Sequence, residues 1–163
     1  METTFSISEP LNKEQAYDEF LGKFQAFIEG EHDEIAILAN TAAALKEAFN
    51  FFWVGFYIVR DNQLVLGPFQ GNVACNRINK GKGVCGTAWE KVQSQVVPNV
   101  ELFPGHIACS SFSKSEIVVP ILADNKVVAV LDIDSDKLNT FDDTDRIKLE
   151  RLTDIISSHI YNK

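Results

Sequence analysis

Apolar residues recur at helical spacing in two segments near the start of the chain. Over residues 13–29 they follow the i, i+3, i+4, i+7 pattern that is typical of an amphipathic helix. Asn12 and Gln15 have the spacing of a capping box before this segment, and Gly30 supplies a stop signal after it. A second helix with one apolar face is predicted to begin at Asp33.

The middle of the chain has the patterns of β-strands. Strands are predicted over residues 53–59, 63–70, 116–123 and 126–134. Asp61-Asn62 and Asp124-Asn125 have the composition of hairpin turns, so the strands pair as two hairpins. Residues 71–115 are less regular and hold all three cysteines and most of the glycines. Irregular segments of this kind are where binding and catalytic residues concentrate.

These elements predict one domain over residues 1–163, which is a length that suits a single domain. A last helix begins near Asp142, so the order is two helices, a hairpin, the irregular insert, a second hairpin and a helix. This order indicates an α+β fold with a central antiparallel sheet. The N- and C-terminal helices are expected on one face, and the insert is expected to roof a pocket on the other.

Charge and composition narrow the classes of partner. The formal net charge of −8 disfavours nucleic acid and anionic membrane surfaces. No apolar run reaches the length of a membrane span, and the residues after Met1 lack the apolar region of a signal peptide. We therefore expect a cytoplasmic protein. Three cysteines cannot pair fully within one chain, so we expect free thiols or a transient disulfide.

Two groups of side chains on the predicted strands are candidates for a pocket. Trp53, Gly55 and Tyr57 share one strand face, where two rings flank a missing side chain. This gap is either a site for a small ligand or ordinary aromatic packing. Asp132 and Asp134 also share a face, together with the valines at 128 and 130. They either mark the exit of the strand into solvent or bind a cation, and crowding would raise the pKa of each carboxyl group.

The run from Gly81 to Gly86 fits G-x-G-x-x-G, and Glu101 follows Gly81 by 20 residues. The dinucleotide fingerprint also needs a parallel βαβ unit, which this sequence does not predict. A helix over about residues 84–92 remains, and the free N–H groups at its start attract anions. A substrate carboxylate is a suitable ligand for them.

The spacing of the thiols argues against a structural metal site. Cys75 and Cys85 are ten residues apart, Cys109 follows after another 24, and no C-x-x-C pair exists. His106 alone is more typical of a structural hydrogen bond than of a metal ligand. We therefore expect neither a metal nor a bound cofactor.

Seven short motifs resemble those of the free methionine-(R)-sulfoxide reductases, which are stand-alone GAF domains. The motifs are WVGFY at 53–57, GPFQG at 67–71, AC at 74–75 with RI at 77–78, GKGVCGTA at 81–88, FPGHIAC at 103–109, SKSEIVVP at 113–120 and LDIDS at 131–135. The run that contains them, from Trp53 to Asp134, covers about half of the chain. The resemblance implies a GAF-like fold.

The resemblance also implies a mechanism. Cys109 is the implied nucleophile, whose thiolate attacks the sulfoxide sulfur, with Glu116 as the acid, assisted by Asp134. Cys109 becomes a sulfenic acid, and a second thiol resolves it to a disulfide. Cys75 is the favoured resolving residue and Cys85 the alternative. Thioredoxin is the implied external reductant.

Free methionine sulfoxide is the implied substrate, and it carries an ammonium and a carboxylate group. The implied substrate-binding residues are Trp53, Tyr57, Asp132, Gly83 and Val84. The aspartates would bind the ammonium group, the N–H groups at 83 and 84 the carboxylate, and the aromatic rings the S-methyl group. Since family members often form dimers, a homodimer is a further expectation.

The sequence departs from the family pattern at two places. Asn99-Val100-Glu101 stands where Asp-Val-His is usual, and Ser110 stands where Asp is usual. If the missing Asp binds substrate, Asn99 retains hydrogen bonding without the charge, and Glu101 is a candidate to compensate.

Two other classes of function remain open: a non-catalytic GAF sensor of small molecules, and a redox sensor in which Cys109 detects peroxide.

Overall fold

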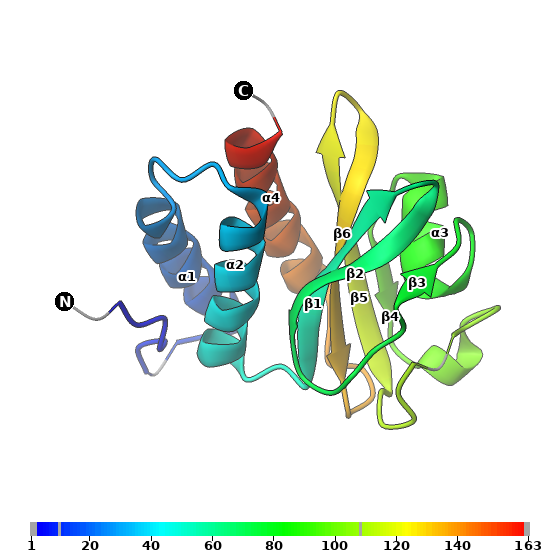
Figure 1. Ribbon diagram of the computed structural model, residues 1–163. Helices are drawn as coiled ribbons and strands as arrows, with labels where there is room; N and C mark the ends of the chain where they lie inside the picture. Colours follow the sequence, from blue (N-terminus) through cyan, green and yellow to red (C-terminus); the bar gives the residue numbers. More distant parts are fainter. Residues whose placement is uncertain (1–2, 10, 108, 162–163) are drawn as a thin grey trace.

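Helices and loops enclose an antiparallel sheet on both faces in the computed structural model, which describes residues 3–9, 11–107 and 109–161 (Figure 1). The helices are α1 (Lys13–Phe27), α2 (Glu34–Phe49), α3 (Gly83–Lys91), the 3₁₀ helix η1 (Val100–Leu102) and α4 (Asp143–Ile160). The strands are β1 (Trp53–Arg60), β2 (Gln63–Gln70), β3 (Arg77–Ile78), β4 (Gln95–Val97), β5 (Ser115–Ala123) and β6 (Lys126–Ser135). None of the described helices combines the length and apolar character needed to cross a membrane.

The predicted helix starts are confirmed by their caps. Asn12 and Gln15 form the capping box of α1, and the Asp33 side chain accepts a hydrogen bond at the start of α2. Asp142 and Asp145 form a second capping box at the start of α4. These side chains satisfy backbone N–H groups that have no partner inside the helix, which is why each helix begins where the sequence indicates.

The two predicted hairpins are also confirmed. Asp61 and Asn62 connect β1 to β2, and Asp124 and Asn125 connect β5 to β6, all with positive φ as two-residue hairpin turns require. The strand order is β3-β2-β1-β6-β5-β4, with every pair antiparallel. The two short edge strands, β3 and β4, come from the insert and were not predicted.

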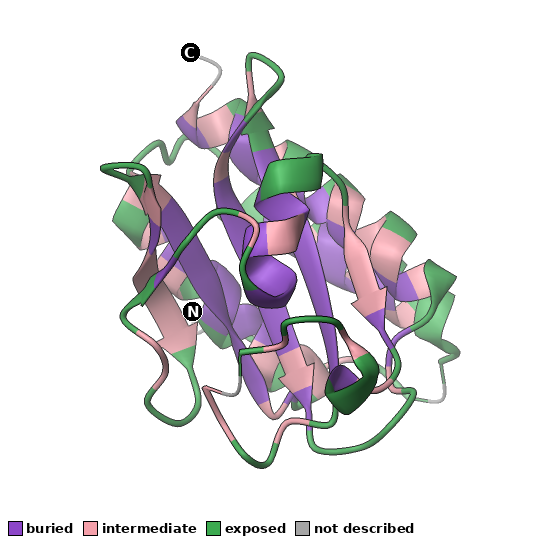
Figure 2. Cartoon of the chain, turned by 90° about the vertical axis from the view of Figure 1, so that its right-hand side faces the viewer, coloured by how far each residue is buried: buried purple, intermediate pink, exposed green. Residues whose placement is uncertain are grey.

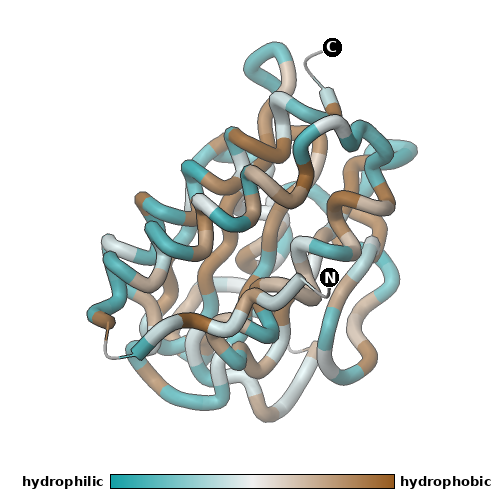
Figure 3. The backbone as a smooth tube through the Cα atoms, turned by 90° about the vertical axis from the view of Figure 1, so that its left-hand side faces the viewer, coloured by the Kyte–Doolittle hydropathy of each residue, from teal (hydrophilic) through white to brown (hydrophobic). Residues whose placement is uncertain are grey.

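The sheet separates two apolar clusters. Helices α1, α2 and α4 cover one face, and the apolar side of these helices turns toward the sheet (Figures 1 and 3). On the other face, α3 and the loops of the insert cover a smaller cluster that contains Trp53, Tyr57 and Cys85 (Figure 2). The predicted arrangement, with helices on one face and a roofed pocket on the other, is confirmed.

One detail of the predicted strand faces is wrong. Leu131 and Ile133 point toward the helices, and Val130 points toward the pocket, as alternation requires. Val128, however, packs on the helix side instead of sharing the face of Asp132. The β5–β6 register shifts next to this position, and the extra residue of a bulge reverses the alternation beyond it.

Candidate active site

Strand register alone brings three pocket residues into one row. Asp134 on β6 pairs with Trp53 on β1 and with Glu116 on β5. In the next row on the same face, Asp132 pairs with Gly55. Because directly opposite residues on neighbouring strands project to the same face, the two aspartates, the glutamate and the indole share one surface.

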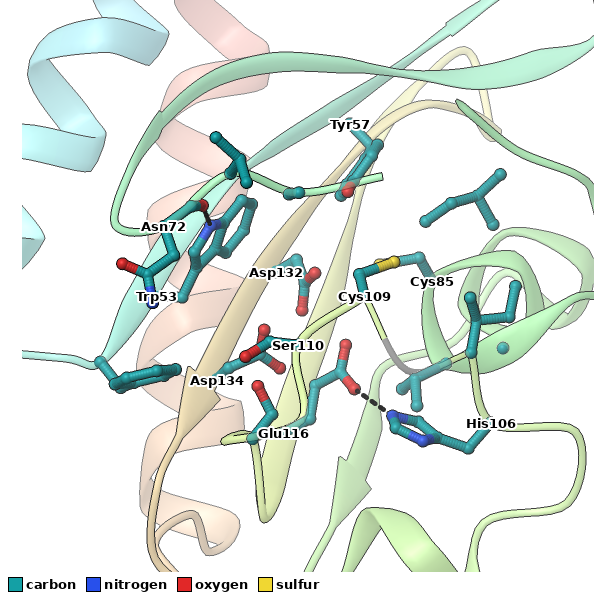
Figure 4. A pocket seen from close by; sticks show the side chains of 18 of the residues that line it. Trp53, Tyr57, Asn72, Cys85, His106, Cys109, Ser110, Glu116, Asp132 and Asp134 are labelled. Carbon is teal, nitrogen blue, oxygen red and sulfur yellow. Dashed lines mark hydrogen bonds and ion pairs between the residues drawn. The ribbon is translucent and has the colours of Figure 1, made fainter. Parts of the chain in front are cut away.

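A pocket lies over this surface, between the sheet, α3 and the loop that precedes β5 (Figure 4). The pocket brings together these predicted site residues: Trp53, Tyr57, Gly83, Val84, Cys85, Cys109, Glu116, Asp132 and Asp134. The two aspartates therefore do not mark an exit into solvent. Their catalytic and binding roles remain predictions.

The remaining predicted site residue, Cys75, reaches the pocket through a disulfide. Cys75 precedes β3 and is bonded to Cys109, which precedes β5, with 5.5 Å between the two Cα atoms. Cys85 is a free, buried thiol on α3. Of the two thiols considered as partners of Cys109, the structure joins Cys75.

Aromatic side chains form one wall of the pocket. The rings of Trp53 and Tyr57 are 6.3 Å apart, and the Trp53 ring also stacks on Phe69 at 5.3 Å. A Cβ at Gly55 would lie only 2.7 Å from the Trp53 ring and 2.3 Å from the Phe69 Cβ. The space above Gly55 is thus filled by the indole, so this glycine permits packing instead of leaving a gap for a ligand.

Two hydrogen bonds fix this wall to the loop that carries Cys75. The Trp53 Nε1–H donates to the Asn72 carbonyl oxygen at 2.9 Å (Figure 4). The Tyr57 hydroxyl donates to the Cys75 carbonyl oxygen, also at 2.9 Å. The aromatic wall and the disulfide are therefore held in a fixed relation.

Burial and crowding favour the neutral forms of the three carboxyl groups. Burial first, and then the charges of Asp132 and Asp134, raise the pKa of Glu116 well above its usual value. Burial and the charge of Asp132 do the same to the pKa of Asp134. The pKa of Asp132 is also raised by burial, although hydrogen bonds from Glu116 and Cys85 partly offset this effect. The pocket thus holds carboxyl groups that keep their protons to a higher pH than usual.

Two polar atoms in this group have no hydrogen-bonded partner among the described residues. They are Oδ1 of Asp132 and Oγ of Ser113, both buried. The Ser113 hydroxyl lies near the Asp134 carboxyl group and lowers the pKa of Asp134, which partly offsets the effect of burial. The two groups do not, however, reach hydrogen-bonding geometry. Since buried polar atoms are nearly always paired, these atoms indicate a place for a polar ligand.

His106 and Cys85 complete the polar lining. The His106 Nε2 lies 3.9 Å from the Glu116 carboxylate, and burial lowers the pKa of the imidazole (Figure 4). Burial raises the pKa of the Cys85 thiol well above its usual value, with the charge of Asp132 as the next cause. Cys85 is therefore a neutral thiol in this pocket.

The start of α3 lies at the pocket as predicted. Lys82 is its N-cap residue and supplies no side-chain cap, so the first N–H groups, at Gly83 and Val84, have no helical partner.

The glycines of the G-x-G-x-x-G run have a packing explanation. A Cβ at Gly86 would lie 2.4 Å from the Asn79 carbonyl oxygen, and no parallel strand pair exists in the described sheet.

Sequence reasoning did not assign several residues that line the pocket: Phe52, Asn72, Val73, Ala74, Ile78, Ile107 and Ser113. Most lie in irregular segments, where no periodicity indicates which side chains point inward. Of the departures from the family pattern, Ser110 lines the pocket, whereas Asn99 and Glu101 do not. The Asn99 side chain instead accepts a hydrogen bond from the Glu101 N–H at the start of η1. Because Glu101 is not among the residues that line the pocket, it does not compensate there.

Comparison with known proteins first identifies the class of fold. A family model described as "GAF domain" matches residues 31–160 of the chain. The chain is 54% identical over 148 residues to GAF domain-containing protein A of Dictyostelium discoideum, covering 90% of this chain and 94% of that protein. It is 46% identical over 143 residues to the free methionine-R-sulfoxide reductase of Escherichia coli (strain K12), covering 87% of each. A solved structure of free methionine-R-sulfoxide reductase from Neisseria meningitidis, in complex with its substrate, superimposes with a TM-score of 0.93 at 48% identity, covering 98% of this chain and 95% of that one. The chain belongs to the GAF domain family and, within it, to the free methionine-R-sulfoxide reductases.

Proposed function

We propose that this protein reduces free L-methionine-(R)-sulfoxide to L-methionine. The observation that carries the proposal is the Cys75–Cys109 disulfide beside a pocket that holds three buried carboxyl groups. This combination supplies a nucleophile, a resolving thiol and an acid for a leaving oxygen. The names of the E. coli and N. meningitidis relatives, and the substrate bound in the latter, support the same reaction.

In the first step the thiolate of Cys109 attacks the sulfoxide sulfur. The Glu116 carboxyl group, whose raised pKa favours the protonated form, protonates the sulfoxide oxygen, and Asp134 on the neighbouring strand assists through its charge, which helps to raise that pKa. The attack forms a transient sulfur–sulfur bond, and both this bond and the sulfur–oxygen bond of the substrate break as the oxygen passes to Cys109. The products are methionine and a sulfenic acid on Cys109, so the substrate is reduced by two electrons and the cysteine is oxidised by two.

In the second step the thiol of Cys75 attacks the sulfenic sulfur. A disulfide forms and one water molecule leaves, which accounts for the substrate oxygen and two protons. An external dithiol, which we propose to be thioredoxin, then reduces the disulfide by exchange and supplies both electrons and both protons. No bound metal or organic cofactor is required for this cycle.

The pocket matches the charges of a free amino acid. The carboxylates of Asp132 and Asp134 bind the ammonium group, which also draws them into the ionised form. The N–H groups of Gly83 and Val84 receive the substrate carboxylate at the helix start. Trp53 and Tyr57 enclose the S-methyl group. A methionine sulfoxide inside a peptide lacks both charges and would leave the polar groups of the pocket unpaired.

Two further features belong to this proposal. A catalytic disulfide that must be reduced in every cycle suits the reducing cytoplasm, which is where we place the protein. We also propose a homodimer as its state in solution. Sedimentation equilibrium tests the dimer independently of the activity.

A coupled assay tests the reaction. NADPH consumption is followed with thioredoxin, thioredoxin reductase and free L-methionine-(R)-sulfoxide, with the S epimer and a methionine-sulfoxide peptide as controls. We expect turnover of the R epimer alone and none with Cys109→Ser. Absence of turnover in the wild type, or equal turnover in Cys109→Ser, overturns the proposal. Faster oxidation of the thiols by peroxide than by the sulfoxide would instead identify a peroxide sensor.

A further inference from the structure

The third cysteine and two of the carboxyl groups form a group that the proposed reaction does not use together. One potential ligand atom from each of Cys85, Glu116 and Asp132 lies within 4.8 Å of the other two. All three residues are buried, with exposures of 3%, 6% and 6%. All three also line the pocket, so a solute that enters it reaches them.

A second observation points to a ligand at this place. Oδ1 of Asp132 is buried and has no hydrogen-bonded partner in the described part of the chain. A divalent cation bound by the ionised forms of these groups would offset the repulsion between their like charges by coordination.

We propose that Cys85, Glu116 and Asp132 form a reversible binding site for a borderline-soft divalent cation such as Zn²⁺. One sulfur and two oxygen ligands match the donor types of zinc, and a fourth ligand, such as water, would come from the pocket that all three residues line. The arrangement is that of three protein ligands with an open position, and it is not a closed structural site. Mg²⁺ and Ca²⁺ are poor occupants, because they require six or more oxygen ligands and avoid sulfur.

This site overlaps the place that the proposed function gives to the substrate ammonium group, through Asp132. Binding of Zn²⁺ and of methionine sulfoxide is therefore mutually exclusive, which makes the cation an inhibitor. This consequence depends on the proposed function, whereas the existence of the metal site does not.

The disulfide form of the protein allows a direct test. With Cys75 and Cys109 bonded, Cys85 is the single thiol of the chain. Titration of this form with Cd²⁺ is expected to produce the ultraviolet charge-transfer band of a cadmium thiolate at one equivalent. Zn²⁺, measured by calorimetry, is expected to displace Cd²⁺, and Mg²⁺ is not. Absence of the band in the wild type overturns the proposal.

Variants assign the ligands. Cys85→Ser should remove the cadmium band and weaken zinc binding by about tenfold or more, and Asp132→Asn should weaken zinc binding to a similar extent while Cys85 stays in place. Asp124→Asn, at the tip of the β5–β6 hairpin, is the matched control and should bind as the wild type does. Unchanged zinc affinity in Asp132→Asn overturns the proposal even if Cys85→Ser does not fold.

The overlap with substrate is measured separately, in the double variant C75S/C109S, which also retains Cys85 as its single thiol. Increasing concentrations of free methionine sulfoxide should lower the apparent zinc affinity in proportion. Zinc binding that is insensitive to the sulfoxide would contradict the ammonium site of the proposed function and leave the metal site supported. Loss of zinc binding in this variant, with the sulfoxide still bound, would overturn the metal site and leave the ammonium site supported.

Discussion

Glu116 and Asp134 lie directly opposite each other in the pairing of β5 with β6, with both carboxyl groups turned into the pocket (Figure 4). Opposite residues on antiparallel strands have Cα atoms only about 5 Å apart, so two ionised side chains there repel each other. Burial is the larger effect, and together with the nearby charge of Asp132 it raises the pKa of both groups. The register of two strands thus places two carboxyl groups with raised pKa values in the pocket that contains Cys109.

Replacing Glu116 tests its role as the acid. A general acid contributes typically about 10²–10⁴-fold, so Glu116→Gln should lower kcat by a factor in this range. Since the acid acts only while protonated, wild-type kcat should fall as pH rises through the raised pKa, and the variant should lack this decline. The measurement is kcat against pH in the coupled assay. Glu101→Gln, outside the pocket, is the control, and a Glu116→Gln enzyme within about twofold of the wild type would contradict the assignment.

The raised pKa values also predict how stability depends on pH. In the folded protein Asp134 keeps a proton that the unfolded chain releases above about pH 4. The contribution of this group to the free energy of unfolding is therefore greatest below the unfolded pKa and is lost as pH rises through the folded pKa. Each unit of elevation corresponds to about 1.4 kcal/mol.

Asp134→Asn removes this ionisation, so the variant should be more stable than the wild type at neutral pH and the difference should vanish at acid pH. Urea unfolding of the disulfide form at several pH values measures this difference in the free energy of unfolding. The isosteric Asp124→Asn at a hairpin tip should leave the pH dependence unchanged. A variant that is less stable at neutral pH would show that Asp134 is ionised in the fold.

The disulfide predicts different outcomes for the two possible resolving thiols. After one equivalent of methionine sulfoxide is added to the reduced protein, Cys85→Ser should form the Cys75–Cys109 disulfide as the wild type does. Cys75→Ser should stop at the sulfenic acid, which a dimedone adduct reveals by mass spectrometry. A disulfide between Cys85 and Cys109 in the wild type would reverse the assignment of the resolving residue.

Gly55→Ala tests the packing of the aromatic wall. The new methyl group would overlap Phe69 and the Trp53 ring, so we expect a loss of about 1–3 kcal/mol in stability and a raised KM for the sulfoxide. Gly22→Ala is the matched control, because a Cβ there meets nothing within 4 Å and lies inside α1. That change should stabilise the protein by about 0.5–1 kcal/mol with KM unchanged. An unaltered KM in Gly55→Ala would separate the indole from substrate binding.

Substrate analogues test charge recognition. N-acetyl-methionine sulfoxide lacks the ammonium group, which leaves Asp132 and Asp134 without a partner. The kcat/KM for this analogue should be lower than for the free amino acid by about 10⁴-fold, the discrimination typical of unpaired buried polar groups. The analogue is measured beside the methyl ester, which retains the ammonium group and should show a smaller decrease in kcat/KM. Equal kcat/KM for the acetylated and free compounds would contradict the ammonium site.

Local signals in the sequence predicted most of the fold. The caps at Asn12, Asp33 and Asp142 and the hairpin turns at 61–62 and 124–125 act through neighbouring residues, so each is visible in a short stretch of sequence. Strands β3 and β4 were missed because two or three residues are too few to show an alternating pattern. Val128 was placed on the wrong face because a bulge has no reliable signal in hydropathy.

The chain by itself determined the long helices and the four long strands, the layer arrangement and, through family motifs, the residue types of the site. Only the tertiary structure decided that Cys75 and not Cys85 is bonded to Cys109, that the Trp53 indole fills the space over Gly55, and that Ser113 and Asn72 join the pocket. The physical reason is range. Caps and turns are formed by residues close together in the sequence. The disulfide joins cysteines 34 residues apart, and the carboxyl groups of the pocket come from two strands, so both depend on strand register and loop paths that no local pattern specifies.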